Sequence, residues 1–257
     1  MGVWKTILPS RFVDKTVIIT NAAGSVGLAA AKLFHEEGAN VVANDDRVSK
    51  LRLLERSLGS RFKATSFDLT RPEAGIQLAK AALDEFKSID ILICNEGASQ
   101  GRPLMDVTSN EWDNVIDRNL TAIFHALQGV YDHFRGKGAG TVILVSSIAG
   151  RSGCGEMVDY SSSMGGVLGM MKTVSREWSR WGVTCTAVCP GPIEEGDQGL
   201  NVKFKSRYSQ TQVELASFRN VTAEQVARVI LFLASDDGKP LNGQAINVDY
   251  GLYLHSI

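Results

Sequence analysis

The amino-acid sequence predicts an α/β fold in which a doubly wound parallel sheet carries helices on both faces. Short apolar segments rich in β-branched residues alternate with longer segments of helical periodicity along the chain. A glycine-containing turn joins the first predicted strand to the first predicted helix. The 257 residues contain no repeat, low-complexity run or linker, so we expect residues 1–257 to form a single domain.

The predicted strands are short and mostly apolar, because a parallel strand covered by helices is buried on both faces. They lie at residues 16–20, 40–43, 63–67, 89–93, 141–145, 184–189 and 245–249. The predicted helices have apolar residues at helical spacing and lie at residues 28–38, 72–86, 109–134, 160–180 and 222–235. Pro72 suits the first turn of its helix, and Thr222 suits the capping position of the last helix.

The turn between the first strand and the first helix reads NAAGSVG, from Asn21 to Gly27. A strand, a glycine-containing turn and a helix form the phosphate-binding arrangement of dinucleotide folds, because the first helical amides point at the pyrophosphate. Asparagine tolerates positive φ better than most residues, and the hydroxyl of Ser25 could donate to a phosphate. We therefore expect cofactor contacts from Asn21, Gly24, Ser25, Val26 and Gly27.

Asp45 follows the second predicted strand, about twenty residues after this turn, where an acidic residue binds the adenosine ribose hydroxyls of NAD. A carboxylate there repels the additional phosphate of NADP, whereas Arg47 would attract it. The alternative is that Asp45 belongs to a solvated turn. We favour ribose binding and so predict NAD(H) as the cofactor.

Ser147 follows the strand at 141–145, and Tyr160 begins a helix thirteen residues later. This segment resembles the catalytic segment of the short-chain dehydrogenase/reductase family, in which a serine and a tyrosine hold the reacting oxygen. The resemblance implies a Rossmann-like fold with Ser147 and Tyr160 as catalytic residues. It also implies a catalytic role for Asn119, which matches the asparagine that bends a helix and holds a water in the family's proton relay.

Three further segments resemble that family's cofactor site. Asp68 and Leu69 match a pair that flanks the adenine, residues 94–97 match an Asn-Asn-Ala-Gly motif, and residues 190–193 match a segment beside the nicotinamide. The resemblance assigns cofactor contacts to Asp68, Leu69, Asn95, Gly97, Pro190, Gly191 and Ile193. Glu96 replaces the alanine of the motif; it either points to solvent, which we favour, or serves as an acid/base group. Residues 191–220 are expected to form the substrate lid.

Met164 stands where the family has a lysine, four residues after the tyrosine. Residues i and i+4 share a helix face, so a lysine there would place a cation beside Tyr160 and lower its pKa. A shift from about 10 to about 7 needs roughly 4 kcal/mol, which a methionine cannot supply. Arg151 is the only lysine or arginine between residues 138 and 171, and it is the candidate replacement.

Three functions remain open at this point. The first, which we favour, is an NAD(H)-linked oxidoreductase acting on a small-molecule alcohol or ketone. The second is a non-redox enzyme, a cyclase, isomerase, dehydratase or lyase, in which Ser147 and a neutral Tyr160 donate hydrogen bonds to a developing oxyanion. The third is a non-catalytic subunit, because a fold alone does not fix an activity.

The composition of the chain indicates which classes of partner and which cellular compartment to expect. A net charge of −1 gives no electrostatic footprint for nucleic acid or for an anionic membrane, and no apolar run is long enough to span a bilayer. Four cysteines without paired spacing predict reduced thiols in a cytoplasmic protein, and the scattered histidines predict no metal site. The expected partner is a small-molecule substrate.

The resemblance also implies self-association as a homodimer or homotetramer, because proteins of that family pair through two long helices. Their counterparts here are residues 109–135 and 158–181. The second helix carries apolar residues that we expect to support the interface: Leu168, Met171, Val174 and Trp178.

Overall fold

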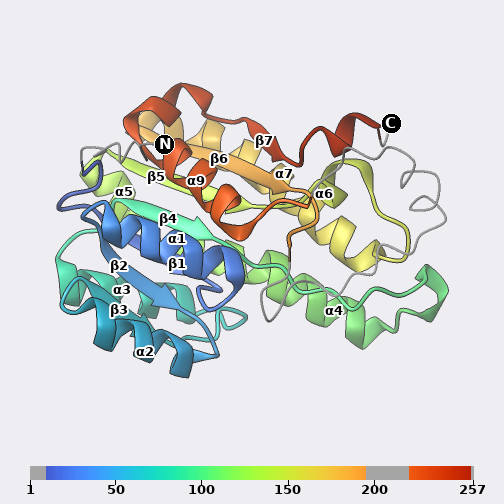
Figure 1. Ribbon diagram of the computed structural model, residues 1–257, viewed down its shortest axis with the longest axis horizontal. Helices are drawn as coiled ribbons and strands as arrows, with labels where there is room; N and C mark the ends of the chain where they lie inside the picture. The colour runs from blue at the N-terminus through green and yellow to red at the C-terminus, as the bar shows by residue number, and fades with distance from the viewer. Residues whose placement is uncertain (1–9, 195–219, 256–257) are drawn as a thin grey trace, which may run out of the picture.

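The computed structural model describes residues 10–194 and 220–255. Its core is a seven-stranded parallel sheet with the strand order β3-β2-β1-β4-β5-β6-β7 (Figure 1). The strands are Thr16–Thr20 (β1), Asn40–Asn44 (β2), Phe62–Thr65 (β3), Ile91–Cys94 (β4), Gly140–Val145 (β5), Val183–Pro190 (β6) and Ala245–Val248 (β7). All seven predicted strands are confirmed, and with them the fold class of a single Rossmann-like domain.

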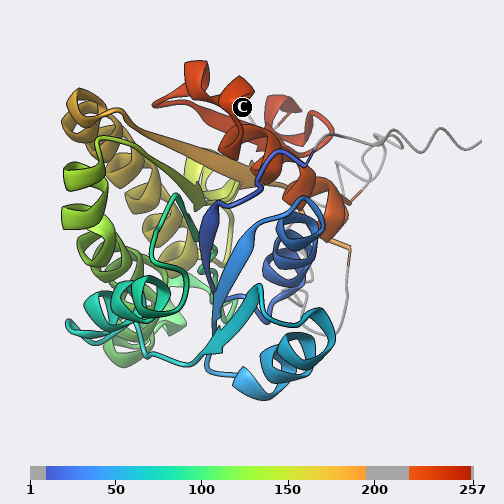
Figure 2. The same ribbon diagram turned by 90° about the vertical axis from the view of Figure 1, so that its left-hand side faces the viewer.

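Helices cover both faces of the sheet, and alternate residues of a strand face opposite layers. One layer contains α1 (Ser25–Glu36), α2 (Val48–Leu58) and α9 (Ala223–Ala234), and the other contains α3 (Ala74–Phe86), α5 (Ala122–Lys137) and α7 (Val158–Trp178) (Figure 2). In β1, Val17 and Ile19 pack in the first layer, whereas Ile18 packs in the second. Burial on both faces explains why the five inner strands, β2, β1, β4, β5 and β6, read as mostly apolar runs.

The strand order places a crevice next to β1. This strand pairs with β2 on one side and with β4 on the other, so the direction of winding reverses between β1 and β4. At such a point the segments that leave the carboxyl ends of the two strands diverge and open a crevice for ligands. The turn after β1 and the segment after β4, both predicted to bind cofactor, flank this crevice.

The helix predicted at 109–134 is interrupted. α4 (Ser109–Ile116) passes into a π-helical turn, η2 (Asp117–Thr121), before α5 continues the path. Asn119 lies in the middle of this turn, and its side chain binds the backbone of Ala98. Single π turns of this kind occur frequently at functional sites.

A helix of the structure, α2, was not predicted. The sequence pattern does not indicate it, because Leu51 is the one buried residue of that helix. The cap of α9 is confirmed, since the Thr222 hydroxyl accepts from the amide of Gln225 at 3.1 Å.

Of the lid predicted at 191–220, residues 195–219 lie outside the described residues. None of the described helices combines the length and the apolar character that a membrane crossing requires.

Candidate active site

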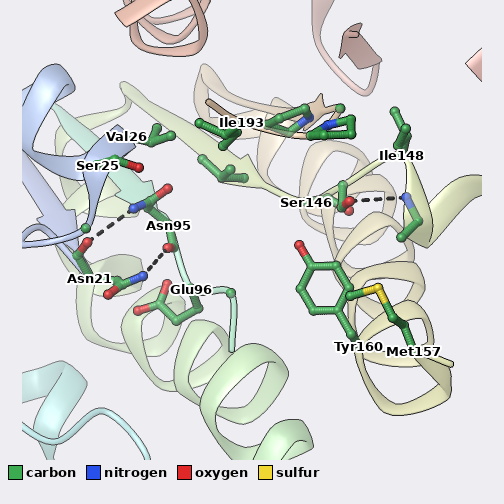
Figure 3. Close-up of a pocket in the computed structure, with 18 of the residues that line it drawn as sticks. Asn21, Ser25, Val26, Asn95, Glu96, Ser146, Ile148, Met157, Tyr160 and Ile193 are labelled. Atoms are coloured by element: carbon green, nitrogen blue, oxygen red, sulfur yellow. Dashed lines mark hydrogen bonds between the residues drawn. The ribbon is translucent and has the colours of Figure 1, made fainter. Parts of the chain in front are cut away.

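Two adjoining cavities lie along the carboxyl edge of the sheet. The inner cavity, of 320 Å³, lies over the ends of β5 and β6 (Figure 3). The outer cavity, of 660 Å³, lies over the ends of β2 and β3. Asn21, Gly24, Glu96 and Gly97 line both cavities, so the two form one cleft at the crevice between β1 and β4.

The turn between β1 and α1 has a geometry suited to phosphate binding. Asn21 adopts a φ of 45°, in the left-handed region. A Cβ at Gly27 would lie 2.6 Å from the carbonyl oxygen of Asn21, so this position requires glycine. No side chain caps the first turn of α1, and Gly24, Ser25 and Val26 line the inner cavity. An uncapped helix N-terminus beside a cavity is a favourable site for an anion.

Asn21 and Asn95 tie this turn to the segment after β4. Asn21 Nδ2 donates to the carbonyl oxygen of Asn95 at 2.8 Å, and Asn95 Nδ2 donates to the carbonyl oxygen of Asn21 at 3.2 Å (Figure 3). These two predicted cofactor residues therefore hold the two walls of the crevice together.

Asp45 is buried, and protein donors occupy its carboxylate. Oδ2 accepts from the amide of Ala23 at 2.8 Å and from Arg47 Nη2 at 3.1 Å. Oδ1 accepts from the amide and from Nε of Arg47 at 2.8 and 2.9 Å. Burial acts to raise the pKa of Asp45, but the hydrogen bonds from Arg47 and Ala23 outweigh it and hold the pKa below its usual value. With two donors on each oxygen, Asp45 can bind a ribose only if Arg47 moves, so ribose binding stays a prediction.

The structure brings Ser147 and Tyr160 together in the inner cavity. Both residues line this cavity, and Ser147 Oγ accepts from the amide of Ala149 at 3.1 Å. Both residues are buried, with exposed fractions of 9% and 7%. Burial raises the pKa of Tyr160 above its usual value, and the nearby hydroxyl of Ser147 offsets this only in part. At neutral pH Tyr160 is therefore a neutral hydrogen-bond donor.

Met164 is fully buried behind the tyrosine. It packs in a small apolar cluster with Ala149, Met157 and Tyr160, and it lines neither cavity. The hydroxyl of Ser146 donates to the carbonyl oxygen of Met164 at 2.9 Å, which fixes this turn of α7 against the end of β5. An apolar side chain thus fills the position one helical turn after Tyr160.

Arg151, the candidate replacement for the missing cation, makes its contacts away from both cavities. Its Nη1 donates to Asn247 Oδ1 at 2.7 Å, and its guanidinium lies over the ring of Tyr253 at 4.5 Å from the ring centre. These contacts hold it on β7 and the segment that follows, and it lines neither cavity. Residues almost a hundred positions later in the sequence hold the side chain, and the spacing along the chain could not reveal them.

Asn119 is fully buried and connects three segments. Its Oδ1 accepts from the amide of Ala98 at 2.7 Å, and its Nδ2 donates to the carbonyl oxygen of Ala98 at 2.8 Å and to Ser163 Oγ at 3.0 Å. Ser163 Oγ in turn donates to the carbonyl oxygen of Tyr160 at 2.8 Å. Asn119 thereby positions the first turn of α7, while the proton-relay role implied by the resemblance stays a prediction.

Glu96 does not point to solvent, so the reading that we favoured is wrong. Its Oε2 accepts a hydrogen bond of 2.6 Å from the hydroxyl of Thr20 at the end of β1. Burial, with a smaller contribution from the nearby carboxylate of Asp45, raises the pKa of Glu96 to about 7. The alternative, an acid/base role for Glu96, stays a prediction.

The predicted site residues, all of which the structure describes, gather in the cleft with the exception of Gly27. The inner cavity is lined by Asn21, Gly24, Ser25, Val26, Asn95, Gly97, Ser147, Tyr160, Pro190, Gly191 and Ile193. The outer cavity adds Asp45, Asp68, Leu69 and Asn119. Sequence reasoning missed Met157, which lines the inner cavity and carries no signal in the sequence beyond its nearness to Tyr160.

Comparisons with known proteins identify the family and the fold of the chain. Residues 22–253 match a family model described as Enoyl-(Acyl carrier protein) reductase. The 3-oxoacyl-[acyl-carrier-protein] reductase FabG of Vibrio cholerae is 30% identical over 241 residues, which cover 93% of this chain and 98% of that protein. The enzyme of the same name from Thermotoga maritima is 31% identical over 250 residues, which cover 95% and 100%. The crystal structure of gox2181 is similar in fold, with a TM-score of 0.84 at 24% identity over 95% of this chain and 98% of that chain.

Proposed function

The chain belongs to the short-chain dehydrogenase/reductase family of oxidoreductases, and we propose that it interconverts a small-molecule ketone and alcohol with NAD(H) as its cofactor. The observation that carries this proposal is that Ser147 and Tyr160 line the same inner cavity. Two hydroxyl groups that converge in a buried cavity are suited to hold a carbonyl oxygen and to pass it a proton.

Each part of a nicotinamide dinucleotide can be assigned to a part of the cleft. We assign the pyrophosphate to the uncapped N-terminus of α1. The adenosine is assigned to the outer cavity beside Asp68 and Leu69, and the nicotinamide half to the inner cavity beside Pro190 and Ile193. When bound, NAD(H) would supply a hydride to the carbonyl carbon or take one from the alcohol.

Tyr160 favours the reductive direction. Because burial raises its pKa, the hydroxyl keeps its proton at neutral pH and can pass that proton to a carbonyl oxygen. Oxidation of an alcohol needs the phenolate as a base, and the buried thioether of Met164 offers no cation to stabilise a phenolate. We therefore infer that ketone reduction is the main activity.

A 3-oxoacyl thioester is the first substrate class to test. The relatives from Vibrio cholerae and Thermotoga maritima carry the name 3-oxoacyl-[acyl-carrier-protein] reductase, and such a substrate presents the ketone that Ser147 and Tyr160 would hold. We place the protein in the cytoplasm, because its four cysteines are free thiols and three of them are buried.

The catalytic pair is tested with Tyr160→Phe, and Tyr131→Phe is a matched control because Tyr131 lines neither cavity. NADH-dependent reduction is measured with acetoacetyl-CoA and with cyclic and aryl ketones, after NADH and NADPH binding have been titrated by fluorescence. We expect Tyr160→Phe to lose roughly 10²–10⁴-fold in turnover and to keep its affinity for NADH. Undiminished turnover in Tyr160→Phe would contradict the assignment, and tighter binding of NADPH than of NADH would contradict the choice of cofactor.

A non-redox enzyme is the second candidate, and the observation that favours it is the apolar cluster around Met164 and Tyr160. A neutral Tyr160 and Ser147 can stabilise an oxyanion without any hydride transfer. The same assay separates the two functions, because substrate conversion without NADH oxidation would support the non-redox enzyme. Ligand binding without turnover of any tested compound would instead support a non-catalytic subunit.

A further inference from the structure

Glu96 occupies the point where the two halves of the cleft meet. It lines both the inner and the outer cavity, as do Asn21 and two glycines. Its side chain lies beside Asn21 and Asn95, on the wall of the inner cavity that faces Tyr160 from across the cleft (Figure 3). A ligand long enough to fill both cavities therefore has to pass this carboxyl group.

No cation neutralises this carboxyl group among the described residues. The side-chain donor to it is the uncharged hydroxyl of Thr20. Arg47, the cation of the neighbouring turn, binds Asp45 and Asn21, and Arg118 pairs with Asp46 in the outer cavity. The remaining titratable groups around it are acidic or neutral: Asp45, Asp46 and Asp68 in the outer cavity and the buried thiol of Cys94 on β4.

A carboxylate at this place conflicts with an anionic dinucleotide. Two like charges that share a poorly solvated site repel each other strongly, and the usual outcome is protonation of the weaker acid. A protonated carboxyl group removes the repulsion and offers one O–H donor and an acceptor to ribose hydroxyls. The Thr20 hydroxyl would remain bonded to it in this form.

We propose that Glu96 makes cofactor binding proton-linked: the dinucleotide binds the protein with the Glu96 carboxyl group protonated, and one proton is taken up whenever that group was ionised beforehand. This inference rests on the proposed function, because it assumes that a nicotinamide dinucleotide fills the cleft. Glu96 would therefore decide at which pH an anionic ligand can bind in the cleft. Its neighbour Asn95 ties the two walls of the crevice together.

The proposal fixes the direction of the pH dependence. At pH 6 and below the carboxyl group is almost fully protonated, because its pKa is about 7, and the affinity hardly changes with pH. Above pH 7 the dissociation constant rises about tenfold for each pH unit, since the protonated fraction falls by that factor. Between pH 6 and pH 8.5 the affinity for NADH should weaken roughly 30-fold.

Glu96→Gln tests this proposal on the full chain, since glutamine mimics the protonated group. Glu177→Gln, on an exposed glutamate near the end of α7, is the matched control. NADH binding is titrated by fluorescence from pH 6 to pH 8.5, and calorimetry at pH 8 in two buffers of different ionisation enthalpy counts the protons exchanged. For the unmodified protein and for Glu177→Gln, we expect the affinity for NADH to weaken roughly 30-fold between pH 6 and pH 8.5. At pH 8 each of them should take up close to one proton when NADH binds. Glu96→Gln should show a flat profile and no uptake.

Each other outcome overturns the proposal in a recognisable way. A flat pH profile for the unmodified protein, or the same proton uptake in Glu96→Gln, would show that Glu96 is not the linked group. If Glu96→Ala binds NADH and the unmodified protein does not bind it at any pH, Glu96 prevents cofactor binding whether or not it is protonated. That result would overturn this inference but not the proposed cofactor. No binding of NADH or NADPH by any variant would overturn the cofactor and this inference together.

Discussion

At the scale of single residues, Met164 limits what Tyr160 can do. Met164→Lys would place an ammonium group within the cluster that holds the tyrosine ring, which lowers the pKa of Tyr160 and favours its phenolate. We expect NAD-dependent alcohol oxidation near neutral pH to rise by up to about 10³-fold, with the pH profile displaced toward neutrality. Met164→Leu is the control, since it conserves volume and adds no charge. Lys and Leu variants with equal rates and profiles would refute this role for a cation, and a non-redox enzyme would lose activity in Met164→Lys.

The same scale shows where sequence reasoning stopped. The identities of Asp45, Glu96 and Arg151 were sufficient to mark them as candidates, but their functions depend on partners that no spacing rule reveals. Asp45 meets donors from Ala23 and from its own neighbour Arg47. Glu96 accepts a hydrogen bond from the hydroxyl of Thr20, which is 76 residues earlier in the chain. A charged side chain in a loop can turn in several directions, and long-range packing decides among them.

At the scale of elements, local patterns were reliable where burial is continuous and failed where it is not. The five inner strands of the sheet are predictable, because burial on both faces leaves an apolar run. The periodic pattern does not predict the π turn at Asp117–Thr121, because the turn accompanies a contact between Asn119 and Ala98 that is remote in sequence; only the resemblance implied a bent helix at Asn119. α2 escapes prediction for the opposite reason, since one buried leucine gives almost no pattern.

The π turn leads to a prediction about stability. Asn119→Ala removes the partner of both backbone groups of Ala98 and of Ser163, and a buried polar group left unpaired costs about 1–3 kcal/mol. We expect the free energy of unfolding in urea to fall by about 2 kcal/mol, and ketone reduction to fall with it because α7 carries Tyr160. The exposed Asn114 on α4 provides the control Asn114→Ala, expected within about 0.5 kcal/mol of the unmodified protein. Equal stability of Asn119→Ala and Asn114→Ala would remove the positioning role.

At the scale of the whole molecule, self-association through the helices at 109–135 and 158–181 stays a prediction, but three of the four apolar side chains that we expected to support the interface are buried within the chain. Met171, Val174 and Trp178 are buried in the core of their own chain, where they pack against α5 and the sheet. On α7, Gly169 is exposed, with open space around it. On the neighbouring α5, Phe124 is 47% exposed. Small residues allow helices to approach closely and an exposed aromatic ring supplies apolar area, so this face of the layer is the surface that we assign to a homodimer or homotetramer.

Phe124→Glu tests this assignment. A carboxylate in the centre of a helix-to-helix interface leaves a buried charge without a partner, which costs several kcal/mol. Light scattering at micromolar concentration should therefore show two or four chains for the unmodified protein and a smaller assembly for Phe124→Glu. Leu53→Glu is the control, because Leu53 is 66% exposed on α2, in the opposite layer. A single chain for the unmodified protein would refute self-association, and dissociation by Leu53→Glu but not by Phe124→Glu would move the interface to the α2 edge of the sheet.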